Sequence, residues 1–508
     1  MLWLALLCTA QIAYSDSNPA AIARQWRQSH EQAIVDEFIT LLSLPNVAKN
    51  RPDIDRNAQF LQQMLQRRGV ATQLLHAPEV LHAPEVLHAP QTPGALPVVY
   101  GEIRTPGATQ TIMFYAHYDG QPVEPSQWKT PPFQPQLRDS DGNTVAVSNI
   151  FHPEWRIYAR SASDDKAPII AWMTALDAFR STKQPLRSNI KFFIDPEEEA
   201  GSPNIAAILK AHKDKLAADV WIFCDGPVHQ SRRQQVVFGV RGSTGFNLTV
   251  FGPKREFHSG HYGNWAPNPV MTLATLMTSM RNENGRILID GFYDDVEPLS
   301  ESEKQAIAAM PSIEAELQDE LALGRMEGNG KRLEELIALP ALNFRGVSAA
   351  GVGSQSRNVI PERATLSVDI RLVRGMDHRR ALEKIRAHIT KQGCFLIDSE
   401  PDDATRKAHP KVCLLQARES GYNAVRASMD SDIAKKVVAA VRSARPGVIL
   451  TPTLGGSLPI APIFETMRAP IIVIPIANHD NNQHGHNENI RIQNLWDGIE
   501  TMAALLLL

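Results

Sequence analysis

The sequence predicts an α/β protein in which a large domain, a mixed sheet with helices on both faces, is interrupted by a smaller α+β domain. From about residue 98, strands that are apolar throughout alternate with helical segments, which is typical of a sheet buried on both faces. Around residue 234 the pattern changes to alternating apolar and polar residues, as in VVFGVRGSTGFNLTVFG, which is typical of an antiparallel sheet with one solvated face. A chain of 508 residues is long enough for two or three such domains.

The chain begins with MLWLALLCTAQIAYS, which is apolar and then rich in small residues. The last three residues of this stretch resemble a small-x-small cleavage site. We therefore predict that residues 1–15 are a secretory signal and that the protein is exported, either to a periplasm or out of the cell. A buried N-terminal helix is the alternative, and the lack of Lys or Arg before the apolar stretch favours it.

Charge and cysteine content narrow the class of protein. The chain has 52 basic and 55 acidic residues and a net charge of −3, which gives no electrostatic reason to expect nucleic acid or an anionic membrane as a partner. No internal apolar run reaches the length of a transmembrane helix. Once Cys8 is lost with the signal, Cys224, Cys394 and Cys413 are an odd and sparse set that predicts no disulfide framework.

Residues 16–233 are predicted to form the first part of the large domain. Helical spacing in AIVDEFITLLSL and AQFLQQMLQRRG precedes the strands VVYGEI, TIMFYAH, NIKFFID and VWIFCD, which alternate with the helices IIAWMTALDAFR and NIAAILKAHKD. Before the first of these strands, LHAPEVLHAPEVLHAP repeats Leu-His-Ala-Pro three times. Because its prolines block a regular helix, we expect a surface loop rather than a metal-binding tract of His76, His82 and His88.

Residues 234–400 are predicted to form the smaller domain, and residues 401–508 the second part of the large one. The helix PVMTLATLMTSMR, the strand ATLSVDIRLV, the helix HRRALEKIRAHIT and the strand CFLIDSE follow the first strand. This order suits a ferredoxin-like β-α-β-β-α-β sandwich, lengthened by a polar insertion at about 290–345. The α/β pattern then returns with SDIAKKVVAAVRSA and APIIVIPIAN.

Metal-competent side chains follow four of the predicted strands. In open α/β sheets, sites form beyond the carboxyl ends of the strands, so we expect these side chains to gather at one edge. Asp164 lies in a further loop that opens a helix. The strand ends carry His117 and Asp119, then Asp195 with Glu197, Glu198 and Glu199, then Asp225, and finally His479, Asp480, His484 and His486.

The residue types at these ends suit a catalytic site with two divalent metal ions. Residues i and i+2 share a face of a strand, so Asp119 could accept a hydrogen bond from one ring nitrogen of His117 while the other nitrogen binds metal. If two ions share Asp164, three carboxylates offset three of the four positive charges, and a hydroxide between the ions offsets the fourth. Histidine and carboxylate ligands with an open position suit zinc, although manganese and cobalt accept the same ligands. The expected metal ligands are His117, Asp164, Glu199, Asp225 and His484.

A free carboxylate beside the metals could move a proton. Glu198, next to the ligand Glu199, is placed for this role. Glu197, in the same run, is expected to be a surface acid.

The motifs at these positions resemble those of the two-zinc amidohydrolase and exopeptidase family of carnosinase, aminoacylase and acetylornithine deacetylase. The resemblance spans most of the chain from about residue 30 and is strongest to the carnosinase-like dipeptidase branch. It is carried by YAHYDGQP, SDDKAP, EEAGS, CDGP and HGHNE, and by WKTPPFQP, FHSGHYGN, RNVIPERATLSVDIRLV and GGSLP in the branch's order.

The resemblance implies a role for each residue. Asp164 would bridge both metals, with His117 and Asp225 completing one site and Glu199 and His484 the other. Asp119 would orient His117, Glu198 would act as general base and then acid, and the bond between Asp164 and Asp165 would be cis. The smaller domain would act as a lid and dimerisation domain of a homodimer, from which His258 reaches the partner's active site, while Asn358, Arg371 and Ser457 hold the free carboxylate of the substrate.

The sequence therefore predicts a metallopeptidase that hydrolyses an amide bond next to a free carboxylate, most simply in a dipeptide, with a hydroxide between the metals and a glutamate base. One alternative is an N-acyl-amino-acid deacylase with the same ligands. Another is an exported metal-dependent binding protein without catalysis, which the presence of Glu198 disfavours. Leu454 stands where dipeptidase relatives often carry glutamate, so the substrate preference stays open.

Overall fold

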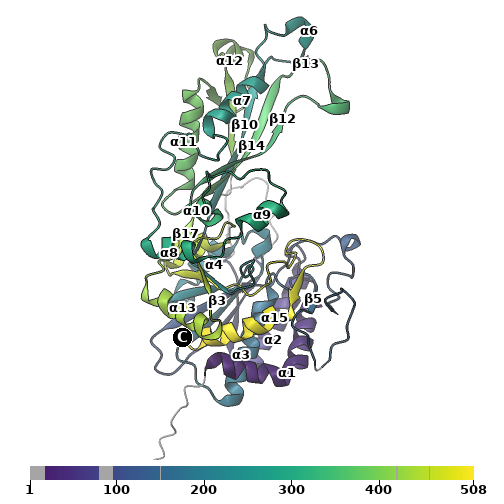
Figure 1. Cartoon of the computed structure of the whole chain (residues 1–508), viewed down its shortest axis with the longest axis vertical. Helices are drawn as coiled ribbons and strands as arrows, with labels where there is room; N and C mark the ends of the chain where they lie inside the picture. Colours follow the sequence, from purple (N-terminus) through teal and green to yellow (C-terminus); the bar gives the residue numbers. More distant parts are fainter. Residues whose placement is uncertain (1–17, 79–94, 149, 419–420, 457) are drawn as a thin grey trace, which may run out of the picture. The chain divides into compact units, whose positions relative to one another are not determined.

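A computed structural model describes residues 18–78, 95–148, 150–418, 421–456 and 458–508. The predicted signal at 1–15, two histidines of the Leu-His-Ala-Pro repeat and Ser457 lie outside these residues. The chain forms two compact units (Figure 1), of which the first consists of residues 1–235, 432–448 and 474–508, and the second of residues 236–431 and 449–473. Among the described residues, no helix is both long and apolar enough to span a membrane.

The first unit contains a mixed sheet. In the described part of the chain its strands β1, β2, β6, β3 and β7 are neighbours in that order, with β3 parallel to β6 and β7, and β2 antiparallel to β1 and β6. These strands are β1 Ala71–Leu75, β2 Val98–Ile103, β3 Thr111–His117, β6 Asn189–Asp195 and β7 Val220–Phe223. Three further short strands, whose residues apart from Gln235 belong to the second unit, are β8 Gln235–Val237, β18 Ile449–Thr451 and β19 Ile471–Val473.

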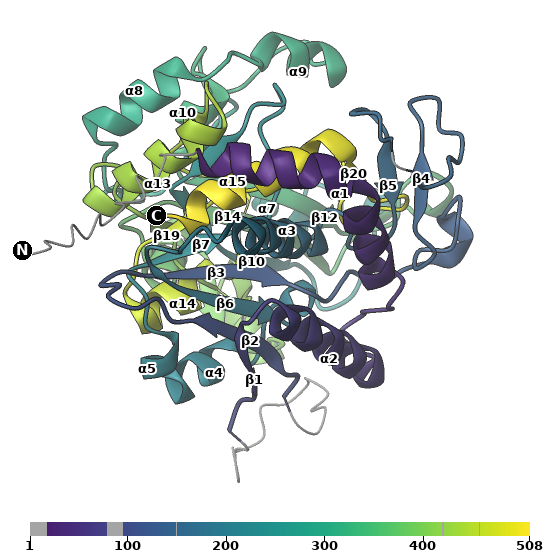
Figure 2. The ribbon, with the colours of Figure 1, turned by 90° about the horizontal axis from the view of Figure 1, so that it is seen from below.

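Helices cover both faces of this sheet, as the sequence predicts. On one face, Trp172 of α3 packs against Phe114 and Phe192, with ring centroids 5.8 and 5.3 Å apart. On the other face, the Lys191 ammonium donates to the carbonyls of Lys215 and Ala217 at the end of α5. Figure 2 shows α1, α3 and α15 on one side of the strands and α4 and α5 on the other. The helices are α1 Pro19–Leu42, α2 Arg51–Arg67, α3 Lys166–Thr182, α4 Ile205–Ala211, α5 Lys213–Leu216, α13 Asp432–Ala444 and α15 Ile492–Leu506.

Three parallel strands end at the same edge of the sheet. β6, β3 and β7 are neighbours, and the pairing of His117 with Asp195 aligns the last residues of β3 and β6. A small sheet in the order β20-β5-β4 brings the C-terminal segment beside residues that precede α3. Its strands are β4 Gln136–Arg138, β5 Arg156–Tyr158 and β20 Asn489–Arg491. The loops after β3, β6 and β7 and the loops around β5 and β20 carry the candidate site.

The second unit contains a five-stranded sheet in the order β12-β14-β10-β16-β15, counted over the described residues. β14 alternates buried and half-buried residues along its length, so one of its faces packs on the core that α7 and α11 complete. The elements are β10 Gly242–Phe251, α7 Pro269–Met280, β12 Ala341–Ser348, β14 Arg363–Leu372, α11 His378–Lys391, β15 Phe395–Ile397 and β16 Val412–Ala417. Shorter elements are β9 Gly239–Val240, β11 Phe257–His258, α6 Ser259–Tyr262, α8 Glu301–Ala309, α9 Glu314–Glu320, α10 Leu333–Ile337, β13 Val359–Ile360, α12 Asp403–Ala408, β17 Val425–Arg426 and α14 Ile460–Met467.

The strand order of the second unit corrects one detail of the sequence analysis. Counted in chain order from β10, the five strands lie across the sheet in the order 2-3-1-5-4, and the fifth strand, β16, is the one that pairs with β10 on the side away from β14. CFLIDSE, which we expected to be that strand, forms only the short β15 at the sheet edge, parallel to β16. The compact unit therefore continues to residue 431, beyond the predicted boundary at 400.

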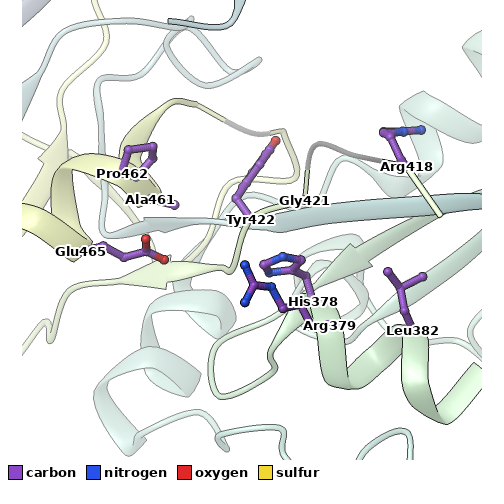
Figure 3. Close-up of a pocket in the computed structure, with 9 residues that line it drawn as sticks. All are labelled: His378, Arg379, Leu382, Arg418, Gly421, Tyr422, Ala461, Pro462 and Glu465. Carbon is purple, nitrogen blue, oxygen red and sulfur yellow. The ribbon is translucent and has the colours of Figure 1, made fainter. Parts of the chain in front are cut away.

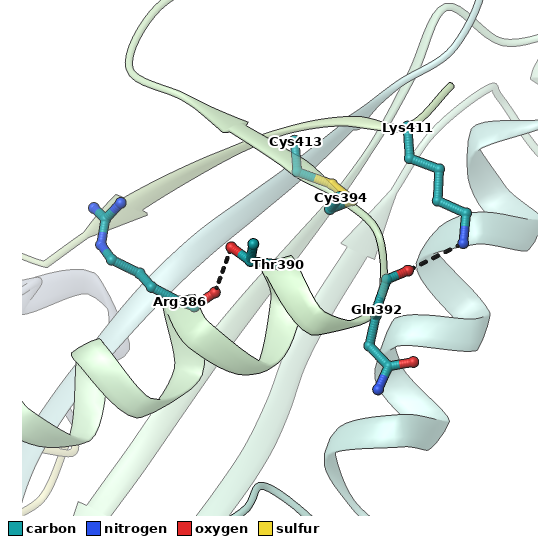
Figure 4. The surroundings of a disulfide bond; sticks show 6 residues. All are labelled: Arg386, Thr390, Gln392, Cys394, Lys411 and Cys413. Atoms are coloured by element: carbon teal, nitrogen blue, oxygen red, sulfur yellow. Dashed lines mark hydrogen bonds between the residues drawn. A yellow bond between two sulfur atoms is a disulfide. The ribbon is translucent and has the colours of Figure 1, made fainter. Parts of the chain in front are cut away.

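A disulfide in the second unit corrects the expectation drawn from the cysteines. Cys394 and Cys413 are both buried and are joined by a disulfide that links the start of β15 to β16 (Figure 4). Cys224 is buried and unpaired. The odd number of cysteines indicated no framework, but one bridge and one buried thiol account for the three described residues.

Candidate metal centre

The end of β3 contributes the first two residues of the site. His117 is the last residue of the strand and is completely buried. Its Nδ1 lies 3.2 Å from the backbone oxygen of Asp119 and 3.3 Å from Asp119 Oδ1. These contacts leave Nε2 free to face the neighbouring loops, as the i, i+2 spacing predicts.

The loop before α3 places one of two adjacent aspartates in the site. The peptide bond between Asp164 and Asp165 is cis, in agreement with the family resemblance. Asp164 turns its Oδ1 to within 2.8 Å of His117 Nε2. Asp165 Oδ2 instead lies 3.4 Å from the backbone nitrogen of His117, which donates to it. The two carboxylates therefore have separate surroundings.

A short 3-10 turn after β6, Glu198–Ala200, carries the next two acids. The carboxylate of Asp119 accepts hydrogen bonds from the backbone nitrogens of Glu198 and Glu199, at 3.0 and 3.1 Å. Asp119 thus holds both His117 and this turn. Gln121, in the YAHYDGQP motif, donates to Glu199 Oε2 at 2.6 Å.

Glu197 is not the surface acid that the sequence suggested. It is 6% exposed, and its Oε1 accepts hydrogen bonds from the backbone and side-chain nitrogens of Asn204, next to the start of α4. Its role is to hold the loop between β6 and α4. A run of three glutamates gave no sign of which one would be buried in this way.

Two groups of side chains offer ligand atoms to a metal. Within each group these atoms lie within 4.8 Å of one another. Asp164 belongs to both, because its Oδ2 lies 3.2 Å from His484 Nε2 while its Oδ1 faces His117. The groups are His117, Asp164 and Asp225, and Asp164, Glu199 and His484, which are the sets expected from the sequence.

The electrostatics of the site indicate cation ligands. Burial raises the pKa of Glu199 and of Asp225 to about 7, and the charge of Asp164 adds to the effect. Burial also raises the pKa of Glu198 well above its usual range. The hydrogen bond with Asp164 raises the pKa of His484. Without cations these carboxyl groups are at least partly protonated near neutral pH, and divalent ions would take the place of those protons.

The donor set fits divalent metals. Each group combines one histidine nitrogen with two carboxylates, and the two oxygens of Asp164 face different histidines. Imidazole and carboxylate ligands with room for a further ligand suit catalytic zinc. Gln483 donates to Asp164 Oδ2 at 3.3 Å and is a neighbour that the sequence analysis missed, although it stands directly before His484.

Other metal-competent residues at the strand ends have structural partners. Asp195 accepts hydrogen bonds from Tyr115 and Ser202. Asp480 pairs with Arg156 and Arg491. These acids belong to ion pairs and loop contacts rather than to the two ligand groups.

The predicted substrate residues that the structure describes lie in the second unit. His258 and Asn358 are exposed and close together, because Ser259 donates its backbone N–H to the Asn358 carbonyl. Arg371 lies on β14, where its Nε is 3.0 Å from Asp369 Oδ2. Ser457 lies outside the described residues.

A separate cavity of about 390 Å³ in the second unit contains none of the predicted site residues among its described lining (Figure 3). Its polar lining includes His378, Tyr422 and Glu465. His378 already contacts Asn423 Oδ1 through both its backbone nitrogen and its ring Nδ1. The cavity therefore lacks the gathered acids and histidines of the first unit.

Two known proteins are similar in sequence to most of this chain. Beta-Ala-His dipeptidase of Homo sapiens is 28% identical over 423 residues, which cover 81% of this chain and 77% of that protein. Cys-Gly metallodipeptidase dug1 of Schizosaccharomyces pombe is 25% identical over 478 residues, which cover 92% of this chain and 94% of that protein.

Solved structures share the whole architecture. The M20 family metallo-carboxypeptidase Sso-CP2 from Sulfolobus solfataricus has a TM-score of 0.71 and 26% identity, and the match covers 94% of this chain and 98% of that one. Human carnosine dipeptidase 1 has a TM-score of 0.69 and 25% identity, with 96% and 98% covered. The model of Peptidase family M20/M25/M40 matches residues 113–508, which include both ligand groups, and the chain belongs to this family.

Proposed function

We propose that this metallopeptidase is a dipeptidase that hydrolyses an amide bond next to a free carboxylate. The observation that carries the proposal is the position of Asp164, whose two oxygens face His117 and His484 beside the half-buried Glu198. The relatives named for dipeptide hydrolysis match most of the chain, which supports the same reaction class here.

The site would hold two divalent metal ions, with zinc as our proposal for both. His117 and Asp225 would complete one ligand set and Glu199 and His484 the other, with Asp164 common to the two. When bound, such ions act as Lewis acids and lower the pKa of water. Manganese and cobalt accept the same ligand types and are the alternatives.

The protein's own residues would then position and move the proton. Glu198 is half-buried, and its removal from water raises the pKa of its carboxyl group, so it holds a proton more readily than an exposed glutamate. It would take a proton from water and pass it to the leaving amine. Asp119 would keep both partners in place, since it contacts His117 and the backbone nitrogen of Glu198.

The second unit would act as the lid that binds substrate. A guanidinium suits a carboxylate, so Arg371 would hold the substrate's free carboxylate with Asn358 and Ser457. His258 would stabilise the oxyanion in the active site of a partner subunit, which requires a homodimer formed through the lid. Size measurement by light scattering tests this assembly, and a monomer with full activity would contradict it.

We also propose that the protein is exported. The N-terminal fifteen residues support this, and so does the disulfide between Cys394 and Cys413, because disulfides persist in oxidising compartments. Thiol titration of the denatured, unreduced protein should find Cys224 free and Cys394 and Cys413 blocked. Free thiols at both of the latter positions in protein taken from its native compartment would contradict export.

An N-acyl-amino-acid deacylase is the second candidate. The chain is 29% identical over 181 residues to Succinyl-diaminopimelate desuccinylase of Acidovorax ebreus, although the match covers only 34% of this chain. The same ligand groups would serve either reaction, so the substrate decides between them.

The test is amino-acid release from free dipeptides and from N-acetyl amino acids, with zinc or manganese added. We expect dipeptide hydrolysis by the wild type and none by Glu198→Gln. Release from the acetylated panel alone would favour the deacylase, and metal uptake without any release would favour a binding protein.

A further inference from the structure

Glu488 is a buried carboxylate beside the metal site that no catalytic role explains. It is completely buried and is the last residue of the HGHNE motif, four positions after His484. Its Oε1 accepts hydrogen bonds from the backbone and hydroxyl of Ser163 and from the backbone of Asp164, each at 2.9 Å. Its Oε2 accepts from the backbone of Ser161 at 2.9 Å and from the Arg160 guanidinium at 2.8 Å.

These hydrogen bonds occupy all the acceptor sites of the Glu488 carboxylate. An ionised carboxylate has about four lone-pair sites, and here five donors converge on it. Hydrogen bonds to an ionised group are about twice as strong as neutral ones, so together they fix the backbone of residues 160–164. Arg160 supplies the positive charge that a buried carboxylate needs, and it also donates to the Gly485 carbonyl at 3.1 Å.

Glu488 also joins two chain segments, one that leads to Asp164 and one that carries His484. Its own carbonyl accepts the backbone N–H of Ala159 at 3.1 Å, and the next residue, Asn489, pairs with Tyr158 across β20 and β5. One segment ends in Asp164, and the other carries His484. Their side chains meet at 3.2 Å.

We propose that Glu488 is a positioning residue that sets the direction of the shared ligand Asp164, and so allows one carboxylate to serve both metal sites. The inference rests on the proposed two-metal site. Since Glu488 touches the backbone of Asp164 and no ligand atom, its effect is on where the two carboxylate oxygens point. Removing its charge should weaken the binding of the ion that needs both Asp164 and His484.

The test compares Glu488→Gln with Glu500→Gln by titrating metal-free protein with Mn²⁺, read by calorimetry and by electron paramagnetic resonance. Glutamine keeps the shape but turns an NH₂ group toward backbone donors. Glu500 is the matched control, because it is a buried carboxylate of the same unit, paired with Arg24 and Arg445 away from the ligands. Both variants lose an arginine-paired buried charge, but only one touches the Asp164 loop.

We expect two Mn²⁺ ions with a spin-coupled spectrum for the wild type and for Glu500→Gln. Glu488→Gln should bind its second ion about 10- to 100-fold more weakly and lose the coupling, as losses of supporting contacts around metal ligands do. Unchanged affinity and coupling in Glu488→Gln, with only a lower melting temperature, would overturn the inference. A single ion in the wild type would instead refute the two-metal proposal, with Glu488 then judged on the affinity for that ion.

If Glu488→Gln does not fold, Ser163→Ala and Glu488→Asp decide the question. Ser163→Ala removes one hydrogen bond and keeps the charge, and Glu488→Asp keeps the charge but shortens the side chain. We expect a graded loss of second-ion affinity, smaller for Ser163→Ala. Equal affinity to the wild type in both variants would contradict the proposed role.

Discussion

The candidate metal centre of the first unit and the proposed substrate residues of the second are built in different ways. His117, Asp164 and Asp225 are at most 5% exposed, and each is held by several hydrogen bonds or lies at a strand end. His258 and Asn358 are exposed, the first at the end of the short β11 and the second directly before the short β13. The difference teaches that burial fixes one ligand group, whereas the other group includes the exposed His484 and the proposed substrate contacts lie on surface segments.

The largest expected effect comes from removing the shared ligand. Asp164→Ala should lose both metal ions and all measurable hydrolysis, because both ligand groups include this residue. Metal content by mass spectrometry and dipeptide release measure the two effects. Asp480→Ala is the control, since that acid follows a strand in the same way but pairs with Arg156. Retention of two ions by Asp164→Ala would contradict the role of Asp164 as a ligand shared by both metal sites.

The second-largest effect is expected from Glu198, to which we assign proton transfer rather than metal binding. Glu198→Gln should lower kcat by roughly 10²- to 10⁴-fold, the usual contribution of a general base, with metal content unchanged. Glu197→Gln should keep kcat near the wild-type value, because Glu197 contacts Asn204 rather than the ligand groups. Steady-state kinetics on one dipeptide compare them, and similar losses in both variants would mean that the loop, not the base, had been damaged.

A smaller effect is expected in the second unit. Arg371→Met should raise KM about tenfold with kcat nearly unchanged, as loss of a substrate contact held equally in ground and transition state does. Arg363→Met is the control on the same strand, where Arg363 pairs with Glu400. A fall in kcat alone for Arg371→Met would place this residue in the chemistry and weaken the contrast between the units.

The smallest expected effect is a pH-dependent change in stability after metal removal. The pKa of Asp225 is about 7 in the folded chain and about 4 when unfolded, so between these values the folded state binds more protons. Stability of the metal-free protein should therefore fall as pH rises through this window. The raised pKa of His484 acts in the same direction, since its contribution is present below its unfolded pKa and is lost as pH rises through the folded one.

Thermal unfolding at about pH 5.5 and about pH 8 measures this effect, with and without zinc. Zinc should raise the melting temperature more at the higher pH, where the ligands are free of protons. Asp225→Asn should reduce the pH dependence of the metal-free protein. A metal-free melting temperature that rises between the two pH values would contradict the assigned shifts.

The contrast between the units also explains what could be predicted from the sequence. The gathering of His117, Glu199 and Asp225 could be predicted from strand ends, because β3, β6 and β7 end at one edge when they run parallel. The division of the ligands into two sets was implied by the family resemblance.

The prediction that CFLIDSE is the fourth strand of a β-α-β-β-α-β sandwich was wrong. CFLIDSE and VCLLQA are both short and apolar, and only tertiary pairing with β10 distinguishes them. The role of Glu488 depends on contacts with a loop far along the chain, which local pattern does not contain. Glu197 contacts the nearby Asn204, but nothing in a run of three glutamates shows which one makes that contact.

The most direct test is dipeptide hydrolysis by metal-free protein as zinc is added in fractions of an equivalent, with Glu198→Gln beside it. We expect wild-type activity to reach its plateau only when two equivalents are bound, while Glu198→Gln binds the same two equivalents and remains inactive. A plateau at one equivalent, or an active Glu198→Gln, would contradict a two-metal site that shares Asp164 and uses Glu198 as its base.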